Sequence, residues 1–316
     1  MMLSVVIPAF NAARFIADAV KSVRLQAAHV QEIIIVDDGS TDDTGQVIAG
    51  LGEDIKYVRQ QNAGPSAARN RGVAMASAPW IAFLDADDVW TANKISEQLA
   101  VLQANPGLGL VASDMAEIDI TGELIRPSVL AAHGLLPFFQ ALNCAPIPHA
   151  LRRLAEKNFI PTGTVIARKD LLVELGGFRP DIRYGEDLEL WARIAARAPV
   201  VCLPRVHLLR RQHSSNATRA TVPMLRDLVK VMQNLRAACG PELRAQGADP
   251  DALVAGALFD LGFWFFTAGE LGMARSAFDQ SLSAKPSLKT ALYATASRLP
   301  AALLREARKA RRFLEN

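Results

Sequence analysis

Short apolar runs alternate with helical patterns over the first hundred residues of the sequence. Residues 3–7, 33–36, 55–58 and 80–84 are apolar runs of strand length, and helical spacing of apolar residues lies between them. This rhythm of strand, helix and strand predicts an α/β domain built from βαβ units. We therefore expect a mostly parallel, Rossmann-like sheet flanked by helices, with ligands bound beyond the carboxyl ends of its strands.

Polar loops follow three of the predicted strands, at residues 8–11, 37–40 and 85–88. Because the carboxyl ends of parallel strands share one edge of a sheet, we expect these loops to converge there. Ser40 and Thr41 are also suited to cap the helix that follows the second loop.

The third of these loops is the most acidic, since Asp85, Asp87 and Asp88 follow a run apolar enough to be buried. Like charges in such a place repel one another unless something neutralises them. An Asp-x-Asp pair at a strand end can bind a hard divalent cation, whose open positions accept phosphate oxygens. A solvated acidic turn is the alternative explanation for this motif taken alone.

Two further residues near the predicted edge are candidates for ligand contacts. Asp38 can accept hydrogen bonds from a base or a ribose, although an ordinary strand-to-helix turn explains the same motif. Arg69, on the helix predicted after Pro65, can pair with a phosphate or with an aspartate of the acidic loop. A purely structural salt bridge is the alternative for Arg69.

A glycine-containing loop ends at Glu186 and Asp187, on the first turn of a predicted helix. A carboxylate held rigidly there can act as a general base on an attacking hydroxyl, but the helix dipole also favours carboxylates as simple caps. His213, after a strand-like run, is a candidate metal ligand or phosphate contact, although a lone histidine is more often neither.

The pattern divides the chain into an α/β region at residues 1–220 and an all-helical region at residues 221–316. Residues 257–286 resemble one tetratricopeptide-like helical hairpin, with a proline close behind the second helix. A single copy predicts a packed helical appendage rather than a solenoid.

Composition restricts the classes of partner and the cellular compartment that we expect for this protein. The net charge of only +3 argues against nucleic acid as a partner, and three widely spaced cysteines fit a reducing compartment without a disulfide framework. The N-terminal apolar run lacks a basic leader, and uninterrupted apolar runs stay short of a bilayer span. We therefore expect a cytoplasmic protein.

Five motifs occur together and in order: SVVIPAFN, IIIVDDGSTDDT, NAGPSAARNRG, IAFLDADDVW and GEDLELW. With these motifs the chain resembles the family 2 glycosyltransferases over roughly its first 220 residues. The resemblance implies a GT-A fold, in which residues 1–105 form the nucleotide-sugar-binding half and residues 106–220 the acceptor-binding half.

The resemblance also implies roles for residues of the donor half. The predicted substrate-binding residues are Pro8, Ala9 and Phe10 along the nucleotide pocket, Asp38 at the base, Arg69 near the nucleotide, and Asp85 and Ala86 near the ribose. Asp85 and Asp87 match the metal-binding Asp-x-Asp motif, with Asp87 as the direct ligand of Mn²⁺ or Mg²⁺. His213 is similar to a histidine that follows the last strand in many members and contacts the metal or the diphosphate.

In the acceptor half, Asp187 matches the catalytic base and Glu186 is its neighbour. Trp191 would pack the helix that carries them and is included among the substrate-binding residues. The resemblance thus implies metal-dependent, inverting transfer of a sugar from a nucleotide-diphosphate sugar, with a UDP-sugar favoured. The acceptor would be a hydroxyl of a saccharide or of a lipid-linked glycan, in polysaccharide or cell-surface glycan synthesis.

Two other functions remain open from the sequence. A sugar nucleotidyltransferase has a similar sheet, but residues 8–11 lack the glycines of its phosphate loop. A non-enzymatic interaction protein with a vestigial transferase-like domain is the second alternative.

The last residues, 299–316, alternate arginine and lysine with apolar side chains. Such a basic amphipathic pattern is compatible with peripheral contact to an anionic membrane, while a packed helix with a solvated basic face is the simpler interpretation.

Overall fold

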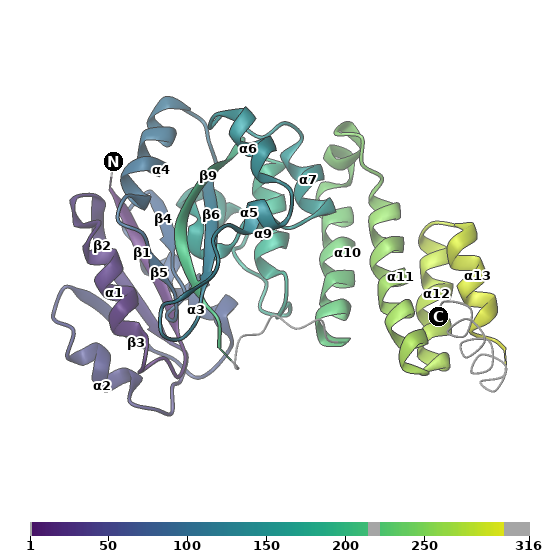
Figure 1. The fold of residues 1–316 in the computed structure, drawn as a ribbon, viewed down its shortest axis with the longest axis horizontal. Coiled ribbons are helices and arrows are strands. Elements are labelled where there is room, and N and C mark those ends of the chain that lie inside the picture. Colours follow the sequence, from purple (N-terminus) through teal and green to yellow (C-terminus); the bar gives the residue numbers. More distant parts are fainter. Residues whose placement is uncertain (1, 214–221, 300–316) are drawn as a thin grey trace. The chain divides into compact units, whose positions relative to one another are not determined.

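The computed structural model describes residues 2–213 and 222–299, and the chain divides into two compact units, Met1–Thr218 and Arg219–Asn316 (Figure 1). The domain boundary predicted at residue 220 lies outside the described residues, as does nearly all of the basic segment 299–316. Each unit is described by itself below.

One mixed sheet forms the framework of the first unit. Its strands are β1 (Leu3–Ala9), β2 (Val30–Asp37), β3 (Ile55–Arg59), β4 (Trp80–Phe83), β5 (Val89–Trp90), β6 (Leu110–Ile118), β7 (Leu124–Arg126), β8 (Ile166–Arg168) and β9 (Val200–Arg211). Along the sheet the order is β3-β2-β1-β4-β8-β6-β9-β5, with β7 paired to β6 at the side. The predicted parallel part is β3-β2-β1-β4, and its strands begin and end close to the predicted apolar runs.

In the second half of the sheet the strand direction reverses twice between β4 and β6, and β5 at the edge is antiparallel to β9. Strand β8 is antiparallel to both β4 and β6, and β9 is parallel to β6. Two reversals cancel, so β6 and β9 run in the same direction as β1, β2 and β4. The carboxyl ends of these five strands therefore lie at one edge of the sheet, where ligands bind in such folds.

Helices cover both faces of the sheet, which explains why β1 is apolar at nearly every position. They are α1 (Ile16–Arg24), α2 (Thr44–Ala49), α3 (Pro65–Met75), α4 (Lys94–Ala104), α5 (Val129–Ala132), α6 (Leu136–Leu142), α7 (Ala150–Glu156), α8 (Lys169–Glu174) and α9 (Glu186–Ala195). Odd-numbered residues of β1, such as Val5 and Ile7, pack in one core with α1 and α4. On the other face, Val6 lies directly under Gly72 of α3.

The predicted cap of α2 is wrong. The helix begins at Thr44, with Asp43 at its N-cap position, instead of directly after Ser40 and Thr41. The Ser40 hydroxyl accepts a hydrogen bond from the Asn11 amide at 3.0 Å, so this residue joins two loops. The motif Asp-Gly-Ser-Thr is therefore a loop-to-loop connection rather than a helix start.

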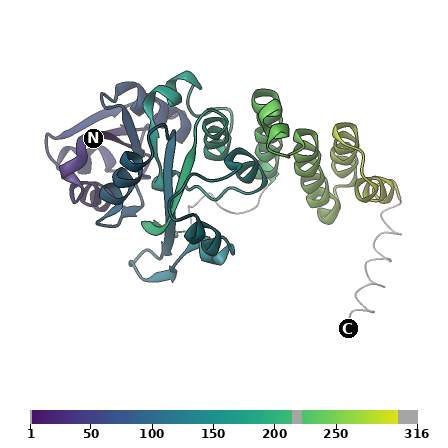
Figure 2. The ribbon, with the colours of Figure 1, turned by 90° about the horizontal axis from the view of Figure 1, so that it is seen from above.

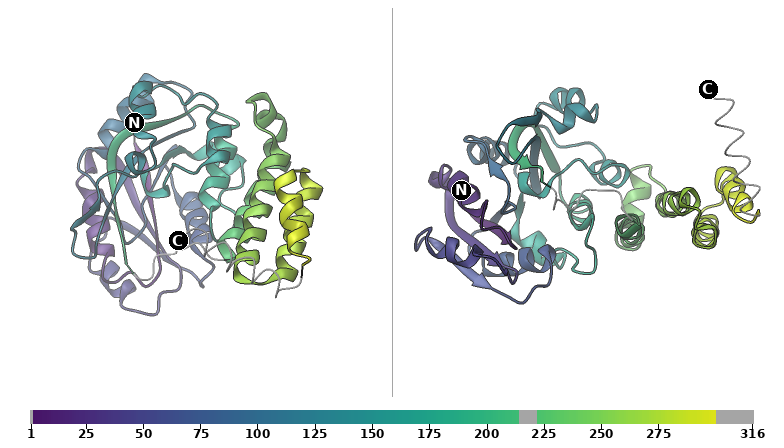
Figure 3. Two further views of the ribbon diagram at one scale, coloured as in Figure 1. Left: turned by 45° about the vertical axis from the view of Figure 1, so that its right-hand side comes forward. Right: turned by 60° about the horizontal axis from the view of Figure 1, so that its bottom comes forward.

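Four helices make up the described part of the second unit: α10 (Val222–Ala245), α11 (Pro250–Ala268), α12 (Leu271–Ala284) and α13 (Leu288–Ala296). Figure 2 looks along these helices and shows each one beside the next, and the left view of Figure 3 shows α11, α12 and α13 lying alongside one another. Gly269, at φ 88°, ends α11 and allows the sharp turn into α12. The tetratricopeptide-like assignment of this hairpin stays a prediction.

By length and composition, α11 is the described helix that could cross a membrane, and half of its most apolar window is buried. Phe259 and Phe266 of α11 pack against Phe278 of α12 and Tyr293 of α13. These aromatic contacts give the helix the buried apolar face expected of a core helix.

Candidate active site

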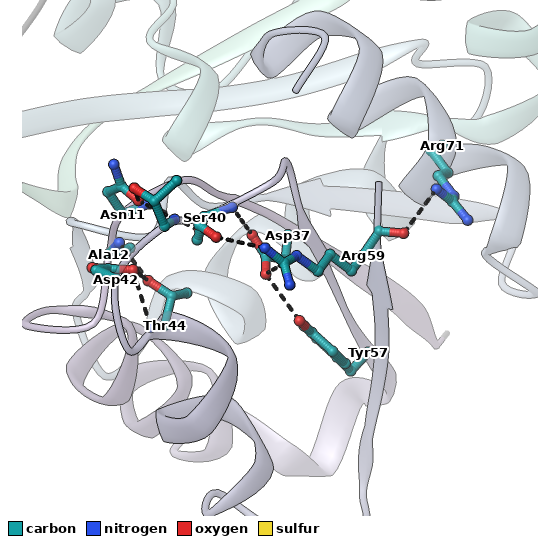
Figure 4. Close-up of polar contacts among 10 residues, drawn as sticks. Asn11, Ala12, Asp37, Ser40, Asp42, Thr44, Tyr57, Arg59 and Arg71 are labelled. Atoms are coloured by element: carbon teal, nitrogen blue, oxygen red, sulfur yellow. Dashed lines mark hydrogen bonds and ion pairs between the residues drawn. The ribbon is translucent and has the colours of Figure 1, made fainter. Parts of the chain in front are cut away.

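The loops after β1 and β2 are joined by hydrogen bonds at the carboxyl edge of the sheet (Figure 4). The Asp38 amide donates to the Ala9 carbonyl at 2.8 Å, and the Thr41 amide donates to Asn11 Oδ1 at 2.8 Å. Asn11 holds φ 50°, a left-handed conformation that asparagine tolerates better than most residues. Hydrogen bonds therefore join two of the three predicted loops into one continuous surface.

The predicted nucleotide-pocket residues of β1 differ in what they expose. Phe10 is 52% exposed and presents its ring at the edge, while Pro8 is partly buried. The methyl group of Ala9 is buried, and its carbonyl already accepts the bond from Asp38. Phe10 is thus the side chain of this segment that a ligand can reach most easily.

Asp37, rather than Asp38, lies at the centre of the contacts in Figure 4. Its buried carboxylate accepts hydrogen bonds from the Ser40 amide at 2.8 Å and from the Tyr57 hydroxyl at 2.9 Å. Arg59 lies 3.7 Å from the same carboxylate and donates to the Ser40 carbonyl at 2.7 Å. Burial and the hydrogen bond to Asp37 raise the pKa of Tyr57. Asp37 thereby fixes the shape of the loop.

The buried carboxylate of Asp38 holds the segment that leads into α3. Oδ1 accepts from Gln60 Nε2 at 2.8 Å and from the Ala63 amide at 2.9 Å, and Oδ2 accepts from the Gly64 amide at 2.7 Å. Three bonds leave little acceptor capacity for a ligand. The contact of Asp38 with a nucleotide base stays a prediction. In the structure, Asp38 holds the segment that precedes α3.

Arg69 connects two of the predicted functional motifs. Its almost completely buried guanidinium donates from Nη2 to Asp85 Oδ1 at 2.7 Å and from Nη1 to Glu186 Oε1 at 3.0 Å. Although burial lowers it, these two carboxylates raise the pKa of Arg69 above its usual value. Arg69 therefore pairs with an aspartate of the acidic loop and also forms a structural salt bridge, the two alternatives that the sequence left open.

The three carboxylates of the acidic loop after β4 differ in how exposed they are. Asp85 is 36% and Asp87 32% exposed, whereas Asp88 is buried and accepts from the Arg211 amide at 2.9 Å. Burial, followed by the charges of Asp87 and Asp85, raises the pKa of Asp88 well above its usual value. The side chain of Ala86 is buried, so this predicted substrate-binding residue can offer only backbone atoms.

His213 meets the acidic loop from the end of β9. Its Nε2 lies 2.8 Å from Asp87 Oδ2, and its ring stacks on Phe15 with centroids 5.5 Å apart. Arg211, two residues earlier, donates to the Asp87 carbonyl at 3.1 Å. The structure therefore brings together two of the three predicted metal ligands, from strands that lie far apart in the sequence.

Asp85 is held by Arg69 instead of joining this pair. Among the residues that the structure describes, three His, Cys, Asp or Glu side chains do not come together in a group able to hold a metal. A carboxylate and an imidazole at 2.8 Å are nevertheless donors that suit a divalent cation, and phosphate oxygens commonly complete such sites. Asp87 and His213 therefore fit the implied metal and supply part of its ligand set.

The predicted catalytic pair begins α9, after Gly185 at φ 81°. Asp187 accepts from Asn158 Nδ2 at 3.3 Å and from Thr162 Oγ1 at 3.4 Å, as well as from the Leu188 amide at 2.6 Å. Burial raises the pKa of Asp187. Burial and the neighbouring Asp187 raise the pKa of Glu186 to about 7, against the charge of Arg69. A carboxylate with a raised pKa, close to neutral donors, is suited to general base chemistry.

Trp191 is completely buried, which corrects its place among the substrate-binding residues. Its ring packs against Phe83 of β4 and Phe178, with centroid distances of 6.0 and 5.4 Å. The apolar spacing of α9 contained this signal, since Trp191 lies three residues from both Leu188 and Ile194, on the buried face of the helix. Trp191 therefore anchors α9 to the sheet.

A second anchor was not foreseen from the sequence. Asn70, next to Arg69 on α3, donates from Nδ2 to the Phe178 carbonyl at 2.7 Å and accepts from the Phe178 amide at 2.8 Å. An asparagine in a helix gives no local sign of such a distant partner. Asn158, Thr162 and Arg211 were missed for the same reason.

Comparison with known proteins decides the family. Residues 4–160 match the profile of Glycosyl transferase family 2. The chain contains a family 2 glycosyltransferase domain. The matched residues include the loops after β1, β2 and β4 that meet at the carboxyl edge, but end before α9.

Curated relatives of this glycosyltransferase domain agree. An uncharacterized glycosyltransferase of Rickettsia conorii is 35% identical over 62% of this chain, but the chain spans only 30% of that relative's length. The succinoglycan biosynthesis protein ExoU of Rhizobium meliloti is 32% identical over 61% of this chain and 56% of its own length. A putative teichuronic acid biosynthesis glycosyltransferase of Bacillus subtilis, TuaG, is 28% identical over 69% of this chain and 84% of its own. The domain thus has homologues in polysaccharide biosynthesis.

Solved structures show the same fold. TarS of Staphylococcus aureus, residues 1–349 with UDP-GlcNAc, superposes with a TM-score of 0.66 at 18% identity, covering 90% of this chain and 82% of that one. The mannosyltransferase PcManGT of Pyrobaculum calidifontis, with GDP-Man and Mn²⁺, gives 0.59 at 19% identity over 93% and 79%. The glycosyltransferase domain therefore has the predicted GT-A type of fold.

Proposed function

We propose that this glycosyltransferase transfers a sugar from a nucleotide-diphosphate sugar to a hydroxyl of a saccharide or lipid-linked acceptor. The favoured donor is a UDP-sugar, and the reaction serves polysaccharide synthesis. The observation that carries the proposal is the double ion pair of Arg69 with Asp85 and Glu186. It ties the acidic donor loop to the helix that bears Asp187. Donor and base would then act at one place, as a transfer reaction requires.

A divalent cation, Mn²⁺ or Mg²⁺, fits the Asp87–His213 pair. Asp87 and His213 would hold it, with Asp85 on the side of the ribose. Bound there, the cation would supply positive charge against the departing diphosphate. The Mn²⁺ and GDP-Man of PcManGT and the UDP-GlcNAc of TarS support a metal and a sugar nucleotide at an edge of this type.

Asp187 is proposed as the base. Its carboxylate would take the proton of the acceptor hydroxyl while that oxygen bonds to the anomeric carbon. The bond from this carbon to the diphosphate oxygen breaks on the opposite side, which inverts the configuration. The raised pKa of Asp187 favours proton uptake at this position. Glu186 would keep Arg69, and through it Asp85, in place.

Calorimetric titration with UDP, GDP, dTDP and CDP, each with and without Mn²⁺, tests the donor half of this proposal. We expect one nucleotide to bind, to need the metal, and to lose binding in Asp87→Ala. Asp54→Asn is the matched control, since Asp54 is exposed and precedes β3, at the opposite edge of the sheet. Lack of binding by all four nucleotides would contradict the proposal and favour an interaction protein.

We also propose that the enzyme works in the cytoplasm and touches the membrane through the basic segment 299–316. The support is the alternation of cationic and apolar residues in its sequence. Flotation of the full chain with anionic vesicles should fall after deletion of residues 299–316. Equal flotation of both proteins would contradict membrane contact through this segment.

A further inference from the structure

The end of β9 and the two residues that follow it are fixed against the candidate active site. The Arg211 guanidinium donates to the Asp87 carbonyl at 3.1 Å, and the Gln212 amide donates to the Ile118 carbonyl of β6 at 2.8 Å. His213 comes next and brings Nε2 to 2.8 Å from Asp87 Oδ2. These hydrogen bonds hold the backbone immediately before His213, so the rotation of its imidazole depends on what the ring itself contacts.

The imidazole of His213 lies against the ring of Phe15, the residue at the N-cap position of α1. The two ring planes differ by only 15° and the ring centroids are 5.5 Å apart, within the range typical of stacked aromatic pairs. Such a contact uses the face of the imidazole, while Nε2 lies in the ring plane and is directed at Asp87. Phe15 therefore sets the orientation in which His213 meets the acidic loop.

Phe15 is itself held in place by the segment that leads into α1. Its amide donates to the Ala12 carbonyl at 2.9 Å, and the Ala12 amide donates to Thr44 Oγ1 at 2.8 Å. The next residue, Ile16, is completely buried in the core that α1 shares with β1. Ala12 directly follows Asn11, which joins the loops after β1 and β2. The position of Phe15 is therefore fixed relative to these two joined loops.

Two guanidinium groups also lie over the ring of Phe15. The Cζ atoms of Arg14 and Arg211 are 5.3 and 5.1 Å from the ring centroid, a distance at which the aromatic face attracts a cation. Arg211 Nη2 lies 3.2 Å from Asp18 Oδ2, one turn further along α1. The start of α1 therefore holds both Arg211 and His213 beside the acidic loop.

A role in core packing alone does not account for these contacts of Phe15. Its side chain is only partly buried, whereas the neighbouring Ile16 supplies the buried side chain at the start of α1. A hydrogen-bonding neighbour would compete with a cation for the imidazole nitrogens of His213. A stacked phenyl ring orients the imidazole through its face and does not compete in this way. An aromatic side chain at position 15 therefore suits a histidine that serves as a metal ligand.

We propose that Phe15 is a positioning residue for His213, whose imidazole it holds so that Nε2 and the Asp87 carboxylate bind one divalent cation together. The inference rests on the proposed transferase function, in which Asp87 and His213 hold Mn²⁺ or Mg²⁺. Groups that orient a metal-binding histidine typically change the metal affinity about 10–100-fold when they are replaced. Phe15 lies outside the five sequence motifs, so this role is one that the motifs do not indicate.

The test is binding of Mn²⁺ to the full chain in the presence of UDP, followed by electron paramagnetic resonance. Titration gives the Mn²⁺ affinity, and the pulsed experiment detects a nitrogen nucleus bonded to the metal, which reports the imidazole directly. Phe15→Leu keeps an apolar side chain but removes the flat ring, and Phe15→Tyr keeps the ring. Phe138→Leu is the matched control, because Phe138 of α6 also has an arginine guanidinium over its ring, 4.2 Å from the centroid.

We expect Phe15→Leu to bind Mn²⁺ about tenfold more weakly and to lose most of the nitrogen signal. Its affinity for Mg²⁺ should change less, because Mg²⁺ takes mainly oxygen ligands. Phe15→Tyr and Phe138→Leu should keep both the affinity and the signal. An unaltered Mn²⁺ affinity and nitrogen signal in Phe15→Leu would overturn the proposed role. An equal loss of affinity for both metals would indicate general damage to the site and would overturn it as well.

A second measurement needs neither a variant nor a metal. Nuclear Overhauser spectra of the unchanged protein should contain cross-peaks between the ring protons of Phe15 and those of His213. Such cross-peaks would show that the two rings are stacked in solution before any cation binds. Their absence would overturn the inference even if Phe15→Leu failed to fold.

The results separate this inference from the proposed function. Lack of Mn²⁺ binding by the unchanged protein would contradict the proposed metal site, and the role of Phe15 with it. Mn²⁺ bound without a nitrogen signal would remove His213 from the ligands and overturn the inference, while Asp87 could still hold the metal. Mn²⁺ bound with the same affinity and nitrogen signal by the unchanged protein and by Phe15→Leu would contradict the role of Phe15 alone.

Discussion

The guanidinium of Arg69 donates to Glu186 Oε1 at 3.0 Å across 117 residues of sequence. The Glu186 side chain is only 12% exposed, and that of Arg69 6%. The same guanidinium holds Asp85 at 2.7 Å. Because Asp187, the proposed base, is the next residue of α9, this one buried cation sets the position of Asp187 relative to the acidic loop.

Arg69→Ala should destabilise the protein strongly. The change leaves Asp85 and Glu186 without their cation, and removing one partner of a buried pair typically costs about 3–5 kcal/mol. Urea unfolding measures the loss. Arg152→Ala removes an exposed arginine that pairs with Glu156 and should cost less than about 1 kcal/mol. Equal costs for the two variants would show that the Arg69 bridge contributes no more than a surface pair.

Glu186 should make the protein less stable as the pH rises from about 4.5 to about 7. Its pKa is raised from 4.5 to about 7 in the folded chain, so between these values the folded state holds a proton that the unfolded state has lost. Ionisation of the unfolded chain then lowers the free energy of unfolding, by up to about 3 kcal/mol for this group. Above about pH 7 both states are ionised and the effect is complete.

Unfolding in urea at several pH values compares the unchanged protein with Glu186→Gln. The variant cannot ionise at this position, so its stability should fall less over the same range. Asp187, whose pKa is also raised, contributes with the same sign and remains in both proteins. If the free energy of unfolding changes with pH in the same way in both proteins, the pKa of Glu186 is not raised in the folded chain.

Asp187→Asn should abolish sugar transfer while it spares donor binding. The amide keeps the size of the side chain but cannot accept a proton, and loss of a general base typically costs about 10²–10⁴ in rate. Product formation measures the rate, and calorimetry with the nucleotide that binds measures the donor site. Asp181→Asn, an exposed carboxylate in the loop before α9, is the matched control. Near-normal turnover by Asp187→Asn would remove Asp187 from the role of base.

The first half of the sheet could be predicted because each strand is a continuous apolar run with polar residues at its end. The 80–84 run, for example, matches β4 (Trp80–Phe83) to within one residue. The second half could not be predicted in the same way. Strand β8 inserts between β4 and β6 in antiparallel direction, directly after a 3₁₀ turn at residues 162–164. Such choices depend on partners far away in the sequence, which local patterns do not encode.

The same limit applies to the candidate site. The residue types Asp87, Asp187 and Arg69 could be selected because carboxylates and guanidinium groups at strand ends and helix starts suggest chemistry. The resemblance also placed His213 with Asp87, but the residues that hold the site in position could not be selected. Asn70 binds the Phe178 backbone 108 residues away, and Asn158 donates to Asp187 across 29. Trp191 was misplaced because it lies close in sequence to functional residues while its side chain faces the core.

Gly72→Ala should destabilise the first unit, because α3 packs on β1 without room for a methyl group. A Cβ at this position would overlap with Val6 Cγ1, and extra methyl groups in a packed core usually cost about 1–3 kcal/mol. Arg69 and Asn70 lie on the same helix, so a displaced α3 should also weaken nucleotide binding. Urea unfolding and calorimetry measure the two effects.

Gly256→Ala in α11 is the control for Gly72→Ala, since a Cβ there meets nothing within 4 Å. Its gain in helix propensity should raise the stability of the second unit by about 0.5–1 kcal/mol. The double variant Gly72→Ala with Val6→Ala frees space for the new methyl group and should recover nucleotide binding. If the loss persists in that double variant, crowding between α3 and β1 is not its cause, and the seat of Arg69 on α3 depends on some other contact.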